Sequence, residues 1–245
     1  MPNHDAPDTE TVDMSTPATP DGITATDYIA AYAARSAADP ARAALILIDM
    51  QYATGARSGA LGRKLAAHGS AVGNYRFDRI ERFVVPNAAR LLAAFRAAHQ
   101  CVVYVTIGAR LPDASDAPAH MRAMFIDLAN HEGSREHEII DELVPLPGEL
   151  VLNKTTIGAF ASSGIDSALR ALGRDQLYLL GVSTNMCVET TAREAADRGY
   201  AVTLVEDACG TTHADLHEST LKNFRRLFGR VCSTAEVVDE LGFAR

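Results

Sequence analysis

The chain has 245 residues, of which 47% are hydrophobic, and its formal net charge is −8 at pH 7. This length suits a single large α/β domain, which buries enough surface to fold without disulfides or a structural metal. The acidic balance, with no dense Lys/Arg run, argues against nucleic acid or an anionic membrane as a partner. No apolar run reaches the roughly 18 residues of a membrane span. No secretory signal pattern opens the chain either, so we expect a cytoplasmic protein.

The N-terminal part of the chain differs in composition from the rest. Residues 1–22 are rich in Pro, Thr, Asp and Ala, and a segment with so few large apolar groups cannot offset its ordering entropy. We predict a disordered or loosely docked arm there. Residues 23–41 predict a helical extension, with a short helix over 26–38, and residues 42–245 are predicted to form the main domain.

Strand and helix patterns alternate from residue 42 onward. Continuous apolar runs, typical of strands buried on both faces, predict strands at 44–48, 101–106, 149–153, 176–182, 200–205 and 230–232. Helical patterns predict helices at 79–99, with a possible break at Pro86, and at 164–172, 187–198, 215–228 and 234–241. Residues 51–75 predict a long polar loop, and residues 111–133 a polar excursion. The alternation indicates a parallel sheet with helices on both faces.

Three chemically useful residues follow three of the predicted strands. In parallel α/β sheets, ligands bind beyond the carboxyl ends of the strands. Asp49 and Lys154 each follow a strand directly, and Cys187 opens the helix after the strand at 176–182. A cysteine attacks as its thiolate, so its pKa of about 8.5 must be lowered or its proton removed during attack. A helix start and Lys154 would favour the thiolate, while Asp49 could accept the proton and later return it.

Each of these residues also has an ordinary structural explanation. An Asp after a strand is usually a turn cap, a lone Lys is usually solvated, and a Cys in an apolar neighbourhood is usually part of the core. The other three cysteines, Cys101, Cys209 and Cys232, fit that last description. The joint placement of Asp49, Lys154 and Cys187 at three strand ends favours a catalytic role for them.

These residues carry a resemblance to a known family. Ile48–Gln51, Lys154 and especially the segment 181–200, GVSTNMCVETTAREAADRGY, resemble the isochorismatase-like cysteine hydrolase superfamily. The resemblance covers roughly residues 42–241. It implies a three-layer α/β/α fold with a six-stranded, mainly parallel sheet, and identifies residues 42–245 as the hydrolase domain. It also implies that Asp49, Lys154 and Cys187 form the catalytic triad.

The same resemblance implies further features of the site and of the assembly. A cis peptide would join Val182 to Ser183 and turn the Ser183 N–H toward the Cys187 N–H, so that the two form an oxyanion hole. One such donor is typically worth about 3 kcal/mol of barrier. The resemblance also implies a homodimer or homotetramer.

Members of the superfamily differ in their chemistry. The presence of Cys187 favours C–N hydrolysis through a thioester over the vinyl-ether cleavage of isochorismatases. Nicotinamidases carry an Asp-x-His metal motif, which is absent after residue 106, and His120, His131 and His137 form no such motif. We therefore expect no catalytic metal and no cofactor. Four segments are most similar to ureidoacrylate-type and biuret-type amidohydrolases: 141–148, 151–154, 168–170 and 184–189.

The resemblance thus implies hydrolysis of a small carbamoyl or ureido compound with release of ammonia or an amine. Nicotinamidase-like, lactam or isochorismatase-type hydrolysis, or a non-catalytic member of the fold, are the alternatives. Five residues near the triad are candidate substrate contacts: Gln51, Tyr52, Phe160, Thr184 and Asn185. Phe160 is equally consistent with plain core. In or beside the unmatched segment 52–75, one of Arg57, Arg63 and Arg76 could pair with a substrate carboxylate, solvent exposure being the simpler interpretation.

Overall fold

A computed structural model describes residues 29, 32–33 and 37–242 of the chain. Six strands form one sheet in the order β3-β2-β1-β4-β5-β6. Every neighbouring pair of strands in this sheet is parallel. The expectation of a mainly parallel sheet is therefore confirmed, and the sheet is parallel throughout. The strands are β1 (Ala43–Ile48), β2 (Cys101–Ile107), β3 (Leu150–Lys154), β4 (Gln176–Val182), β5 (Ala201–Gly210) and β6 (Arg230–Cys232).

The central strand explains why its sequence is apolar throughout. All six residues of β1 are buried. This strand pairs with β2 on one side and with β4 on the other, where Ile48 lies opposite Val105 and Gly181 respectively. A strand covered on both faces has no solvent side, so its residues need not alternate between apolar and polar.

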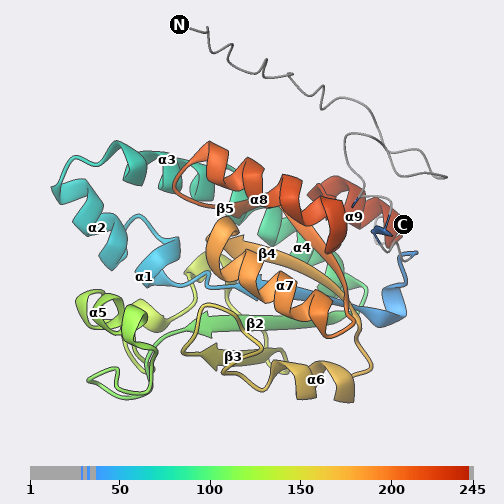
Figure 1. Cartoon of the computed structure of the whole chain (residues 1–245), viewed down its shortest axis with the longest axis horizontal. Helices are drawn as coiled ribbons and strands as arrows, with labels where there is room; N and C mark the ends of the chain where they lie inside the picture. Colours follow the sequence, from blue (N-terminus) through green and yellow to red (C-terminus); the bar gives the residue numbers. More distant parts are fainter. Residues whose placement is uncertain (1–28, 30–31, 34–36, 243–245) are drawn as a thin grey trace, which may run out of the picture.

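Helices cover both faces of the sheet and make three layers (Figure 1). One face packs against residues of α5 (Ala119–Asp127), α6 (Ile165–Ala171), α7 (Glu189–Asp197) and α8 (Ala214–Leu227). The other face packs against α3 (Ala71–Arg79), α4 (Val85–Ala97) and α9 (Thr234–Glu240). The three-layer α/β/α fold is therefore as expected.

The segment 51–75, predicted to be a loop, is helical, and that prediction was wrong. It forms α1 (Tyr52–Gly55), α2 (Ala60–Ala67) and the first half of α3. The Ser70 hydroxyl caps α3 by accepting a hydrogen bond from the Gly73 N–H. Gly59 is needed between α1 and α2, because a Cβ there would lie 1.6 Å from the Tyr52 carbonyl oxygen. The polar excursion at 111–133 likewise contains a helix, α5.

Pro86 does not break the helix that contains it. A π-helical turn, Ile80–Val84, joins α3 to α4, and the Val85 N–H donates to the Ile80 carbonyl five residues back. Pro86 then occupies the first turn of α4. A wide turn of this kind accommodates a proline ring, which would clash with the carbonyl four residues earlier in a regular helix.

The predicted N-terminal arm lies outside the described residues, and so does most of the extension at 23–41. Within the extension, Pro40–Arg42 form a 3-10 turn capped by the Asp39 side chain. The Gln176 side chain, at the start of β4, accepts a hydrogen bond from the Asp39 N–H at 2.8 Å. None of the helices in the described part of the chain is long and apolar enough to cross a membrane.

Candidate active site

The candidate site lies at the carboxyl edge of the sheet, where the strand order reverses. The chain builds the sheet outward from β1 through β2 to β3, and then resumes on the other side of β1 with β4. Asp49 follows β1, and the loop bearing Cys187 follows the adjacent strand β4. This reversal is where open α/β sheets form their ligand crevices.

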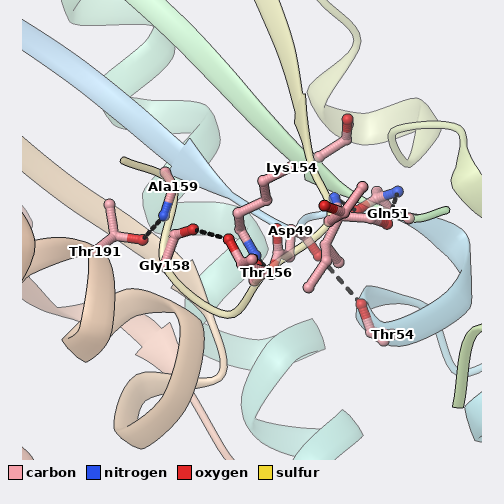
Figure 2. Close-up of polar contacts among 12 residues, drawn as sticks. Asp49, Gln51, Thr54, Lys154, Thr156, Gly158, Ala159 and Thr191 are labelled. Carbon is pink, nitrogen blue, oxygen red and sulfur yellow. Dashed lines mark hydrogen bonds and ion pairs between the residues drawn. The ribbon is translucent and has the colours of Figure 1, made fainter. Parts of the chain in front are cut away.

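Lys154 reaches this point from two strands away. It is the last residue of β3 and pairs in register with Ile107, the last residue of β2. Its side chain therefore extends past the end of β2, and its Nζ lies 3.0 Å from Oδ2 of Asp49 (Figure 2). Both side chains are buried, at 0% and 3% exposure. A buried ion pair thus joins two residues that are 105 positions apart in the chain.

The two oxygens of the Asp49 carboxylate differ in their surroundings. Oδ2 accepts the hydrogen bond from Lys154, whereas Oδ1 is buried and accepts no hydrogen bond from a nitrogen or oxygen donor in the described structure, and the Cys187 thiol is the other group that interacts with this carboxylate. A buried carboxylate oxygen without a donor is costly and uncommon. Asp49 therefore presents one anchored oxygen and one oxygen that is ready to accept a proton or a hydrogen bond.

The backbone at Asp49 is held in an unusual conformation. Its φ of 54° lies in the left-handed region, which residues other than glycine seldom adopt. The Asp49 N–H donates to the Val105 carbonyl at 2.8 Å, and the Thr54 hydroxyl donates to the Asp49 carbonyl at 3.3 Å (Figure 2). Such backbone strain is maintained by surrounding contacts and is frequent at functional sites.

A short segment after β3 also holds the ammonium group of Lys154. Its Nζ also donates to the Thr156 carbonyl at 3.2 Å. The Thr156 hydroxyl in turn donates to the Gly158 carbonyl, and the Ala159 N–H donates to the Thr191 hydroxyl of α7 (Figure 2). The lysine is thereby tied to the helix that follows Cys187. The sequence pattern gave no sign of this role for Thr156 and Thr191.

Cys187 lies in a π-helical turn, Thr184–Val188, that precedes α7. The expectation that it opens the α-helix is thus corrected, because regular α-helix begins only at Glu189. Cys187 is 7% exposed. The Val182–Ser183 peptide before this turn is cis, as the resemblance implied. Gly181 has a φ of 121°, and a Cβ there would lie 2.1 Å from the Ile48 carbonyl oxygen, so only glycine fits.

Burial dominates the protonation state of the thiol. Burial, together with the charge of Asp49, raises the pKa of Cys187 to about 12, although Lys154 opposes the rise. Burial also raises the pKa of Asp49, against the opposing charge of Lys154. Burial lowers the pKa of Lys154, but the charges of Asp49 and Cys187 and their hydrogen bonds with Lys154 raise it by more. The pKa of Lys154 is therefore raised overall. At neutral pH Cys187 is therefore a thiol, and of the two routes expected from the sequence, removal of its proton during attack is favoured.

Three of the candidate substrate contacts have structural partners instead. The Gln51 amide donates to the carbonyls of Ile107 and His137, and its oxygen accepts from the Ile107 N–H, so it joins the end of β2 to the turn at His137. The Tyr52 ring lies under the Arg135 guanidinium, 3.7 Å from ring centroid to Cζ. Phe160 belongs to the core. All three thus have structural contacts in the folded chain, and their contact with substrate stays a prediction.

Thr184 and Asn185 also have partners near the nucleophile. The Asn185 side-chain oxygen accepts from the Thr211 hydroxyl at 2.6 Å. The Thr184 hydroxyl lies 2.9 Å from Nδ1 of His217, and Nε2 of His217 lies 2.8 Å from the Arg79 guanidinium. Burial and the charge of Arg79 lower the pKa of His217 to about 4. His217 is thus neutral at neutral pH, accepts from Arg79 at Nε2, and donates from Nδ1 to Thr184.

The three arginines in or beside the segment 52–75 differ in their burial and in their partners. Arg57 and Arg63 are exposed and pair with acidic side chains, Arg57 with Glu81 and Arg63 with Glu136. Arg76 is only 3% exposed, and its guanidinium donates to the Ser183 hydroxyl at 2.7 Å. The helical structure of this segment determines which arginine turns inward, and the sequence pattern did not show that structure.

The described residues include no group of three or more His, Cys, Asp or Glu side chains placed to hold a metal ion. His137, the histidine nearest the site, hydrogen bonds through Nε2 to the Asn153 side chain at 2.9 Å. Its interaction with Asp49 is a charge effect on the Asp49 pKa, smaller than that of Lys154. The groups that converge here are thus an acid, an amine and a thiol.

The same arrangement of elements occurs in known proteins. Residues 43–236 match the Isochorismatase domain model. The ureidoacrylate amidohydrolase RutB of Pantoea ananatis is 30% identical over 220 residues, which cover 83% of this chain and 84% of that protein. A cysteine hydrolase from Pseudomonas syringae pv. phaseolicola aligns with a TM-score of 0.72 and 28% identity, over 86% of this chain and 97% of that one.

An N-carbamoylsarcosine amidase from Thermoplasma acidophilum is also similar, with a TM-score of 0.59 and 26% identity, over 79% of this chain and 96% of that one. The family model covers most of the chain, and the sheet order places the matched residues in one domain. The chain therefore belongs to the isochorismatase family of hydrolases.

Proposed function

We propose that this protein hydrolyses a C–N bond in a small carbamoyl or ureido compound through a thioester on Cys187, with release of ammonia or an amine. One observation carries the proposal: the buried Asp49 carboxylate holds Lys154 through Oδ2 and also interacts with the Cys187 thiol. The names of two similar proteins, ureidoacrylate amidohydrolase and N-carbamoylsarcosine amidase, support the choice of substrate class.

The first step forms the covalent intermediate. Asp49 Oδ1 accepts the Cys187 proton while sulfur bonds to the substrate carbonyl carbon, because a thiol with a pKa of about 12 is seldom ionised at rest. Lys154 stays positively charged throughout this step. It offsets the negative charge, which moves from Asp49 through the attacking sulfur to the substrate carbonyl oxygen. The N–H groups of Ser183 and Cys187 would bind the carbonyl oxygen as it becomes negative, with one such donor worth about 3 kcal/mol.

The second half of the cycle restores the enzyme. The tetrahedral intermediate collapses, the C–N bond breaks, and the leaving amine takes the proton held by Asp49. Water then adds to the thioester carbonyl as Asp49 removes one of its protons. The C–S bond breaks, and the sulfur regains its proton from Asp49. Each turnover thus consumes one water and leaves Asp49, Lys154 and Cys187 in their starting states.

Turnover of a panel of substrates tests the proposal, with ammonia release measured for the ureides, carbamoyl compounds and nicotinamide, and loss of substrate measured by chromatography for the lactam and isochorismate. The panel holds ureides, N-carbamoyl amino acids, nicotinamide, a lactam and isochorismate. We expect turnover of ureido or carbamoyl compounds, and a fall of at least about a thousandfold in Cys187→Ala, because removing a nucleophile typically costs several powers of ten. Cys101→Ala, which alters a thiol at the opposite end of β2, is the matched control and should keep its activity.

Two results would contradict the proposal. One is turnover of nicotinamide, the lactam or isochorismate in place of every ureide. The other is ureide turnover that survives in Cys187→Ala, since the covalent route needs the sulfur.

A further inference from the structure

Arg76 is a buried cation without an acidic partner among the described residues. It lies on α3, is 3% exposed, and donates its hydrogen bonds to the Thr54 carbonyl and the Ser183 hydroxyl. Arg96, which is also partly buried, pairs with the Glu149 carboxylate. A buried charge that lacks an opposite charge is strongly unfavourable, so Arg76 is expected to meet an anion in the working protein.

The hydrogen bonds of Arg76 leave part of its guanidinium free. Nε and Nη2 share the Thr54 carbonyl oxygen at 3.3 and 2.8 Å, and Nη1 donates to the Ser183 hydroxyl at 2.7 Å. A guanidinium has five N–H groups, so two remain, one on each terminal nitrogen. A guanidinium binds a carboxylate through two of its N–H groups, so the two that remain on Arg76 are enough for such a pair.

The free N–H groups belong to the same site as the proposed chemistry. Ser183, which Arg76 contacts, is the residue proposed to donate to the substrate carbonyl oxygen, and Thr54 contacts the Asp49 backbone. Burial lowers the pKa of Arg76 to about 10, while the charges of Cys187 and Asp49 oppose the fall. Arg76 therefore stays charged at neutral pH. With Lys154 balanced by Asp49, the site carries one positive charge in excess.

We propose that Arg76 is a specificity-determining residue that pairs with a carboxylate on the substrate, so that the enzyme selects anionic ureides over neutral ones. This inference rests on the proposed function. The competing explanation is that Arg76 is a positioning residue, which only orients Ser183 and has no part in substrate choice. The two explanations differ in what the loss of Arg76 does to charged and uncharged substrates.

A matched pair of substrates separates the two explanations. 3-Ureidopropionate and its uncharged amide, 3-ureidopropionamide, share the carbamoyl end and differ in the carboxylate. We expect the wild-type enzyme to prefer the acid by at least about tenfold in kcat/KM. Arg76→Met should lower kcat/KM for the acid by roughly tenfold to a hundredfold, as expected for loss of a hydrogen bond to a charged group. The value for the amide should change only a few-fold.

Two further variants control the comparison. Arg76→Lys keeps the charge without the paired N–H groups, and it should retain part of the preference for the acid. Arg82→Met removes an exposed arginine of the neighbouring π-helical turn, which contacts Phe83, and should leave both kcat/KM values unchanged. Equal losses for acid and amide in the Arg76 variants, or a wild-type enzyme that cleaves both compounds without preferring the acid, would overturn the proposal.

A binding measurement keeps this inference separate from the proposed function. Heat unfolding of Cys187→Ala is followed with each of the two compounds, and only the acid should raise the melting temperature, through Arg76. If the wild-type enzyme cleaves neither compound but the acid alone stabilises Cys187→Ala, the inference is supported and the proposed function fails for this pair. Stabilisation by both compounds equally, or by neither, overturns the inference whatever the activity.

Discussion

Replacing Lys154 with Met should expose how much the buried ion pair contributes to stability. Asp49 would keep a buried carboxylate with no cation beside it, and loss of one partner of such a pair typically costs 3–5 kcal/mol. The carboxylate can escape by taking up a proton. From an ordinary pKa of about 3.9, that uptake costs about 4 kcal/mol at pH 7. The free energy of unfolding should therefore fall by about 4 kcal/mol near neutral pH.

The fall in the free energy of unfolding of Lys154→Met should depend on pH. Asp49 already has a raised pKa from burial, and without Lys154 the pKa rises further. The folded variant then binds this proton more tightly than the wild type does, so its stability deficit grows as pH rises above the pKa of Asp49 in the wild type, which itself lies above the ordinary value of about 3.9. Below that pH both states are protonated and the deficit should nearly vanish.

Urea unfolding followed by circular dichroism at acid and neutral pH measures the deficit. Lys222→Met, an exposed lysine on α8, is the matched control and should stay within about 0.5 kcal/mol of the wild type. Adding Asp49→Asn to Lys154→Met removes the buried charge and should restore most of the loss. A deficit below about 1 kcal/mol in Lys154→Met at neutral pH, or one that does not change with pH, would refute the account of this pair.

Two other predictions concern the reaction and the fold. The pH profile of kcat/KM should rise as Asp49 ionises, above the ordinary aspartate pKa of about 3.9, and fall only at alkaline pH, as Arg76 loses its proton at about 10 and Lys154 above about 10.4. A rise that continued to about pH 8.5 would instead indicate a free thiolate of ordinary pKa. Gly181→Ala should lose at least about 2 kcal/mol of stability in a thermal melt, because of its φ of 121° and the contact with the Ile48 carbonyl. A melting temperature equal to the wild type would contradict that geometry.

The sheet and the positions of Asp49, Lys154 and Cys187 could be predicted from the sequence. Apolar runs such as 44–48 mark buried strands because no polar face interrupts them. The carboxyl ends of parallel strands share one edge, so the residues that follow the strands meet there. The distance between Lys154 and Asp49 could not be predicted, because it depends on a side chain that crosses a neighbouring strand.

The helices at 52–79 and the burial of Arg76 could not be predicted from local patterns. Polar residues and glycines in that segment are typical of loops, and α1 and α2 are stabilised largely by contacts with other parts of the chain. One example is the bond from the Ala60 N–H to the Glu136 side chain, 76 residues away. The unpaired oxygen of Asp49 is likewise a property of the assembled site. Sequence patterns record periodicity, and these features arise from tertiary contacts.

Mass spectrometry of the enzyme quenched during turnover of a ureide tests the central claim most directly. The account predicts an added acyl mass on the peptide that contains Cys187. The adduct should be absent from Cys187→Ala and should persist longer in Asp49→Asn if any forms there. Steady turnover with no adduct on that peptide, or an adduct on Cys101, Cys209 or Cys232, would contradict the account.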